Sequence, residues 1–207
     1  PYGLRTLTEA WMENPPKDLE RVLTIPEKFN TAENLKKMEE NLDKIAKIRV
    51  IAMAQPKLAG LPKKKPDVAE IEIGGGTIQQ QFEYAKSLLG KTVTPAEIFK
   101  EESCDFIIAV GGGSSMDTGK GVALLATNPG RIKDYEIRSM EDLVKGKIKN
   151  HIAPLITIPT TAGTGSEIDF WAVITDTERK FKMCLGQAPL YPGGPYLGAV
   201  YALVDPL

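Results

Sequence analysis

Two short apolar runs, each ending in a loop rich in glycine and hydroxyl side chains, constrain the fold more than any other feature. Phe106 to Val110 leads into three glycines, and Leu155 to Ile158 leads into Pro159 and a segment of threonine, glycine and serine. Continuous apolar runs of this length are typical of strands buried in a parallel sheet. Ligands of such sheets bind at the carboxyl ends of the strands. The pattern predicts an α/β fold with a Rossmann-like parallel sheet flanked by helices.

The first of these loops has the properties of a phosphate or pyrophosphate site. Gly111–Gly113 let the backbone approach a bulky anion, and Ser114 and Ser115 add hydroxyl groups. A helix predicted from Ser115 to Ala126 would offer free N–H groups and a positive dipole end at its start. The alternative is a tight turn without a ligand. In that interpretation Asp117 complements the helix N-terminus and Lys120 is a solvated helix residue.

Two better-known phosphate motifs are excluded. A P-loop has four residues between a glycine and its Gly-Lys pair, whereas five residues separate Gly113 from Gly119. The dinucleotide fingerprint G-x-G-x-x-G fails because Met116 stands where its third glycine belongs. Gly74–Gly76 fails in the same way at Gln79. The glycine loop therefore belongs to neither class.

The length of 207 residues predicts one domain, a single nucleotide-binding domain over 1–207. Within it we expect an irregular segment over 1–30 and a loop-rich tail over 186–207. Capping patterns predict three helices before the first loop, starting after Asn30 (about four turns, with Glu33 completing a capping box), Thr77 and Thr94. Further strands are predicted at 49–53 and 68–73, and a hairpin at 171–175 and 181–185.

Composition excludes several functions. The net charge of −1 gives no electrostatic reason to expect nucleic acid or an anionic membrane as a partner. No apolar run approaches the roughly 18 residues of a membrane span. Cys104 and Cys184 are too few for a disulfide framework and fit a cytoplasmic protein. His151 is the only histidine, so the chain cannot build a multi-histidine metal site, and we expect this residue at the surface.

The two loops together resemble the iron-containing alcohol dehydrogenase family. CDFIIAVGGGSSMDTGKGVA is similar to its first signature, and PLITIPTTAGTGSE is similar to its second, in the same order. The hairpin and the closing VDPL also fit, and the resemblance is strong from about 94 to 185. It implies an NAD(P)-dependent oxidoreductase that transfers hydride between an alcohol and a nicotinamide cofactor. A divalent metal, Fe²⁺ or Zn²⁺, polarises the substrate oxygen in this family.

Carried over by motif, the resemblance implies a set of cofactor-binding residues. Gly112, Gly113 and Ser114 would contact the pyrophosphate, and Asp117 would sit under the same nucleotide. Further candidates line the phosphate and nicotinamide side or the nicotinamide ribose: Thr160, Thr161, Thr164, Val173 and Lys182. No catalytic residue and no metal ligand is expected in this chain, because the family's ligands, one aspartate and three histidines, lie in a helical second domain that this chain is expected to lack.

The choice between NAD and NADP stays open. The family usually has an acidic residue after its first strand, where it holds the adenosine ribose, but the strand at 49–53 leads to Ala54 and Gln55. The run Lys63–Lys65 could favour the 2′-phosphate of NADP, or it is a solvated charge run in a loop.

Three functions therefore compete. The first is the NAD(P)-binding domain of a metal-dependent alcohol dehydrogenase, binding cofactor without catalysis by itself. The second is a relative resembling glycerol dehydrogenase or dehydroquinate synthase. The third is a stand-alone nucleotide-binding or interaction module. The absence of the second half would then leave an apolar patch, and such a patch would favour a homodimer. Its candidate members are Val173, Leu185, Leu190 and Tyr191.

Overall fold

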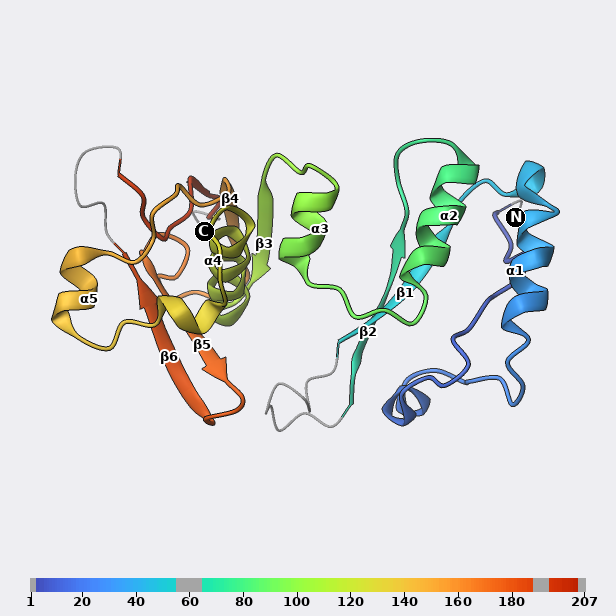
Figure 1. Cartoon of the computed structure of the whole chain (residues 1–207), viewed down its shortest axis with the longest axis horizontal. Coiled ribbons are helices and arrows are strands. Elements are labelled where there is room, and N and C mark those ends of the chain that lie inside the picture. The colour runs from blue at the N-terminus through green and yellow to red at the C-terminus, as the bar shows by residue number, and fades with distance from the viewer. Residues whose placement is uncertain (1–2, 55–64, 188–193, 205–207) are drawn as a thin grey trace. The chain divides into compact units, whose positions relative to one another are not determined.

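The computed structural model describes residues 3–54, 65–187 and 194–204, and it divides the chain into two compact units, Pro1–Val93 and Thr94–Leu207. The single nucleotide-binding domain over 1–207 stays a prediction, beside this division into two compact units. Each unit has its own elements and its own packing, so each is described by itself. Figure 1 shows the order of the elements along the chain.

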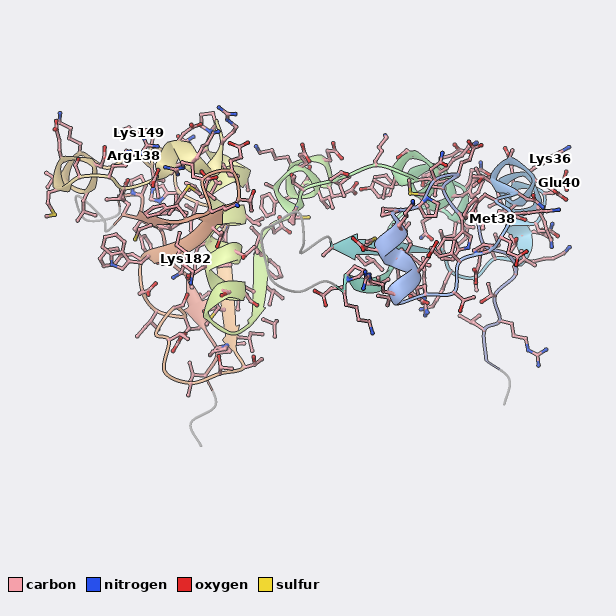
Figure 2. All side chains as sticks on the ribbon, turned by 90° about the horizontal axis from the view of Figure 1, so that it is seen from below. Lys36, Met38, Glu40, Arg138, Lys149 and Lys182 are labelled. Carbon is pink, nitrogen blue, oxygen red and sulfur yellow. The ribbon has the colours of Figure 1, made fainter. Side chains whose placement is uncertain are left out.

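Unit 1 (Pro1–Val93) is built from short helices and one antiparallel ribbon. Its elements are η1 (Lys17–Arg21), α1 (Thr31–Glu39), η2 (Leu42–Lys44), β1 (Arg49–Ala54), β2 (Asp67–Glu72) and α2 (Ile78–Leu88). The helix predicted after Asn30 begins at Thr31 but ends at Glu39, so it is shorter than the four turns expected, and Asn30 makes no side-chain capping bond. Lys36 and Glu40, labelled in Figure 2, form an exposed ion pair on this helix at 3.9 Å.

The ribbon of unit 1 corrects the expected place of its strands. β1 pairs only with β2 among the described strands, antiparallel, with Arg49 opposite Glu72. Neither strand belongs to the parallel sheet. The segment 49–53 therefore does not occupy the place of a first Rossmann strand. Ala54 then does not stand where the family holds the adenosine ribose, and it gives no indication for or against NAD. Gln55, Lys63 and Lys64 lie outside the described residues.

Unit 2 (Thr94–Leu207) contains the predicted parallel sheet, in the order β3–β4–β7. Its elements are α3 (Pro95–Glu101), β3 (Ile107–Gly111), α4 (Gly113–Thr127), η3 (Ile132–Tyr135), α5 (Met140–Lys145), β4 (Leu155–Pro159), β5 (Trp171–Asp176), β6 (Phe181–Gly186) and β7 (Tyr201–Ala202). The capping box of Thr94 with Glu97 forms as predicted, as does the hairpin β5–β6. The fold is α/β, in which β3 and β4 are connected through α4, η3 and α5, and β4 and β7 are connected through the hairpin β5–β6. Strand β7, in the predicted loop-rich tail, was missed because only two residues pair.

Helix α4 is the centre of unit 2, because it packs on both the sheet and the hairpin. On one side its alanines meet β3 and β4 in an apolar cluster that contains Ala109, Ala123 and Leu155. On another side Leu124 packs with Ala172 and Leu185 of the hairpin. Figure 1 shows α4 beside these strands. The two-sided burial fixes the N-terminus of α4 at the ends of β3 and β4.

An ion network lies at the turn of the hairpin β5–β6. Glu136 is buried and accepts hydrogen bonds from Arg138 Nε and Arg179 Nη2, both at 2.9 Å. Asp176 accepts from the backbone N–H groups of Glu178 and Arg179 at 2.9 and 3.0 Å, and from Arg179 Nε at 2.6 Å. These bonds join the segment after η3 to the hairpin turn.

This network predicts a loss of stability in acid. Hydrogen bonds from Arg179 hold the pKa of Glu136 below its ordinary 4.5, and the backbone and side chain of Arg179 hold that of Asp176 below 3.8. A depressed folded-state pKa contributes stability that is present above the unfolded pKa and is lost as pH falls through the folded one. Urea unfolding at pH 7 and at steps below pH 4.5 should show this loss, with a shallower pH dependence in Arg179→Gln. Equal pH dependence in the two proteins would contradict it.

Candidate cofactor site

The two predicted loops lie against each other at the ends of β3 and β4. The N–H of Thr160 donates to the carbonyl of Gly111 at 2.9 Å. A Cβ added at Gly112 would come within 3.0 Å of Thr161 Oγ1, and one at Gly113 within 3.1 Å of Thr164 Cγ2. A side chain at either position would therefore require Thr161 or Thr164 of the second loop to move by a few tenths of an ångström.

The start of α4 offers donors for an anion. Gly112 is the N-cap, it provides no side-chain cap, and the first turn holds no acidic residue. The first amides that bond back are those of Ser115 and Met116, to the carbonyl of Gly112 at 3.0 and 3.2 Å. Within the described residues, no acceptor is recorded for the N–H groups of Gly113 and Ser114, and Ser114 is exposed. Free amides at the positive end of a 15-residue helix favour an anion.

Asp117 supports the loops from beneath. Its Oδ1 accepts from Ser166 Oγ at 2.5 Å, and its Oδ2 accepts from the N–H of Val173 at 3.0 Å. It therefore joins α4 to the second loop and to β5. Both of its carboxylate oxygens have partners inside the protein.

Lys120 is fully buried, so the interpretation as a solvated helix residue was wrong. Its Nζ donates to the carbonyl of Trp171 at 2.6 Å, to Ser166 Oγ at 3.3 Å and to Asp169 Oδ1. Sequence reasoning missed Ser166 and Asp169 as its partners. Because Lys120 follows Asp117 by three residues, the sequence indicates that these two side chains lie close together on a helix. Nothing in the sequence indicates a contact between Lys120 and Asp169, 49 positions away.

The two weaker candidates lie on the hairpin. Val173 is 46 % exposed on β5, and its N–H contacts Asp117. Lys182, labelled in Figure 2, is exposed on β6 and faces Thr175 in the strand register. The structure thus connects Val173 with the loops through Asp117, whereas no hydrogen bond or ion pair of Lys182 with the loops is recorded.

Two carboxylates make the region below the loops electronegative. Burial, followed by the charges of Asp117 and Asp169, raises the pKa of the Cys184 thiol. Cys104 is exposed. Glu167 has a buried Oε2 that no donor reaches within the described residues.

In the part of the chain that the structure describes, no three His, Cys, Asp or Glu side chains group as a metal would require, and His151 is exposed. No described helix is long and apolar enough to cross a membrane. A hollow of about 340 Å³ lies in unit 1, lined by Trp11, Phe29 and neighbouring polar residues. None of the predicted cofactor residues lines it.

Comparison with known proteins finds two families in the chain, and their matches overlap over residues 89–122. Residues 89–206 match the iron-containing alcohol dehydrogenase model, and residues 1–122 match the ribosomal protein L3 model. Choline dehydrogenase of Bacillus subtilis is 48 % identical over 111 residues, which are 54 % of this chain and 25 % of that protein. Large ribosomal subunit protein uL3 of Pyrobaculum calidifontis is 48 % identical over 103 residues, 49 % of this chain and 30 % of that protein.

A solved structure also resembles the chain. Sulfoacetaldehyde reductase from Bifidobacterium kashiwanohense, in complex with NAD⁺, is 27 % identical, with a TM-score of 0.44 over 62 % of this chain and 34 % of that one. The chain spans between a quarter and a third of the length of the two curated relatives.

Fold and loops define unit 2 as an α/β nucleotide-binding unit of the alcohol dehydrogenase type. The chain belongs to the iron-containing alcohol dehydrogenase family over residues 89–206 and to the ribosomal protein L3 family over residues 1–122. The resemblance carried by the two loops is thereby confirmed. The L3 match was not foreseen, and it includes unit 1, whose described strands β1 and β2 take no part in the parallel sheet.

Proposed function

We propose that unit 2 binds a nicotinamide dinucleotide, NAD or NADP, with its pyrophosphate at the start of α4. The observation that carries this proposal is the uncapped helix N-terminus, which the second loop meets at Gly112 and Gly113. In this proposal Gly112, Gly113 and Ser114 face the pyrophosphate. The phosphate and nicotinamide side is lined by Thr160, Thr161 and Thr164, Asp117 supports the loops, and Val173 and Lys182 approach the nicotinamide ribose.

The reaction that fits this cofactor site is hydride transfer between an alcohol and the nicotinamide. Relatives that carry the same segment include a choline dehydrogenase and an NAD-dependent methanol dehydrogenase. In the complete enzyme an Fe²⁺ or Zn²⁺ ion would polarise the substrate oxygen. We assign no metal ligand and no catalytic residue to this chain, which is proposed to bind cofactor without catalysis by itself. A small alcohol or aldehyde is the substrate class of the complete enzyme.

Thermal unfolding with NADH and with NADPH tests the cofactor proposal. A ligand that binds only the folded state at about 100 times its Kd adds roughly 2.7 kcal/mol of stability. We expect one of the two cofactors to raise the Tm of unit 2 by several degrees, and the difference between them to decide between NAD and NADP. Millimolar concentrations of both without any shift would overturn the proposal. A shift without hydride transfer to any alcohol is the result expected of this chain by itself, because no catalytic residue and no metal ligand is assigned to it.

We further propose a homodimer through the open face of the parallel sheet. Strand register places Ile108, Ile156 and Tyr201 in one row across this face, and Val110 beside Ile158. Ile108, Val110 and Tyr201 are 53, 56 and 66 % exposed, although parallel sheets are ordinarily covered on both faces. Of the patch expected from the sequence, Val173 is 46 % exposed and Leu185 is buried, while Leu190 and Tyr191 lie outside the described residues.

Sedimentation tests the dimer. The wild-type chain should sediment as a dimer at micromolar concentration, and Ile108→Glu should sediment as a monomer. A monomeric wild-type protein would reject the dimer and leave the cofactor proposal untouched.

A second candidate function concerns unit 1. Its match to a large ribosomal subunit protein favours assembly with a ribosomal subunit, and this reopens the exclusion of nucleic acid that overall charge suggested. Residues 1–93 hold fifteen basic and thirteen acidic side chains, whereas 94–207 hold eleven and fourteen, so the sum conceals opposite signs. Co-sedimentation of the chain with 50S-type subunits at about 0.1 M salt tests this candidate.

The cofactor site proposed for unit 2 and the ribosomal candidate function of unit 1 belong to one polypeptide that matches both families. The tryptic peptide Glu101–Lys120 lies where the two family matches overlap. Its detection in native protein, together with peptides of 1–93 from the same gel band, would establish this continuity. A cytoplasmic location is proposed on the two free cysteines.

A further inference from the structure

We propose that Lys120 and Ser166 are positioning residues that hold the second loop against the start of α4, and that Lys120 makes no contact with the cofactor. This inference rests on the proposed function of unit 2. A lysine just inside a helix that follows a glycine loop would ordinarily be taken as a phosphate ligand. The contacts of Lys120 indicate a different role.

All three N–H donors of the Lys120 ammonium group have acceptors within unit 2. An ammonium carries three protons, and Trp171 O, Ser166 Oγ and Asp169 Oδ1 accept from it. Its charge is balanced by Asp169 and by Asp117, whose Oδ1 lies 3.9 Å from Nζ. With its side chain fully buried, Lys120 reaches no position that a bound anion could occupy without breaking these bonds.

Ser166 transmits this arrangement to the loop. Its hydroxyl donates to Asp117 and accepts from Lys120, so it lies between the two charged groups of α4. Its N–H donates to Thr164 Oγ1 at 3.4 Å, and Thr164 is the side chain nearest to a Cβ at Gly113. Hydrogen bonds therefore run from the buried lysine through Ser166 to Thr164, which lies beside Gly113.

The loop needs such an anchor because its own conformation is open. Gly163 and Gly165 have φ angles of +99° and +67°, with nothing within 4 Å of a Cβ at either. The loop is held where Thr160, Thr161, Thr164 and Ser166 touch the rest of unit 2, and at Glu167, whose carbonyl accepts from Thr157 Oγ1 at 3.1 Å. Loss of the Ser166 hydroxyl would leave Lys120 and Asp117 short of a partner and would free the loop.

Two measurements test the proposal. The first is acetylation of the intact chain with acetic anhydride, read by mass spectrometry with and without NADH. Lys120 should remain unmodified in both samples, while the exposed Lys182 is modified in the free protein. Modification of Lys120 in the free protein with protection by NADH would make it a cofactor ligand and overturn the proposal.

The second measurement is the Kd for NADH in three variants. Ser166→Ala should weaken binding about tenfold, as expected for a buried hydrogen bond to charged groups, and Ser166→Thr should restore most of it. Ser139→Ala is the matched control, because it removes the hydroxyl that caps α5 at 3.2 Å and should lower stability without changing Kd. Unchanged binding in Ser166→Ala would overturn the positioning role alone. No binding by the wild type would overturn the proposed function, and the positioning role with it.

Discussion

Gly113→Val should abolish most of the stabilisation that NADH gives to unit 2. A Cβ at this position already lies 3.1 and 3.2 Å from Thr164 Cγ2 and Cβ, and valine adds two methyl groups. The second loop must then move away from the start of α4. Because cofactor binding is proposed to need both loops, we expect the affinity for NADH to fall roughly 10- to 100-fold, which removes about 1.4–2.8 kcal/mol of binding free energy. Calorimetric titration measures this change directly.

A matched glycine separates this effect from a general cost of valine. Gly74 lies in unit 1 with nothing within 4 Å of a Cβ and without a positive φ. Gly74→Val should bind NADH as the wild type does. If Gly113→Val binds NADH with wild-type affinity, the contact between the two loops has no part in cofactor binding.

Gly119→Val should destabilise unit 2 by about 1–3 kcal/mol, the usual cost of overpacking a core. A Cβ at Gly119 would lie 2.6 Å from Ala109 Cβ and 3.3 Å from Leu155 Cδ1, where α4 crosses β3 and β4. Valine must therefore push the helix off the sheet. Chemical unfolding should show the loss in the transition of unit 2, without a change in the transition of unit 1.

A second substitution identifies the contact responsible. In Gly119→Val with Ala109→Gly, the closest clash is removed, so the two changes should be non-additive by at least about 0.5 kcal/mol. Thr118→Val is the control on the same helix, since Thr118 is exposed and should tolerate valine with little loss. Additive effects in the double variant would show that Ala109 is not what excludes a side chain at Gly119.

The parts of unit 2 that local sequence dictates were predicted correctly. Thr94 and Glu97 form their capping box because the partners are three residues apart. β3 and β4 pair in parallel as their continuous apolar runs indicated. Asn30 with Glu33 has the same local pattern as Thr94 with Glu97 but makes no cap. The pattern permits the hydrogen bonds and does not enforce them.

The division of the chain was not readable from the same rules. The composition of β1 and β2 predicts strands, but it does not predict which strands pair with each other. They form their own antiparallel ribbon in a unit that matches ribosomal protein L3, so an assignment to the nearest parallel sheet failed. The net charge of −1 sums over two units of different sign, so it describes neither unit.

By itself the sequence determined the two loops, their order and their chemistry, because glycine after a buried strand and hydroxyl groups beside it act through local backbone geometry. Only the tertiary structure decided what lies beneath them. Lys120 is buried instead of solvated because Trp171, Ser166 and Asp169 come from segments up to 51 residues away and accept all its protons. Such partners meet only when α4 packs between the sheet and the hairpin, and no spacing within α4 specifies that arrangement.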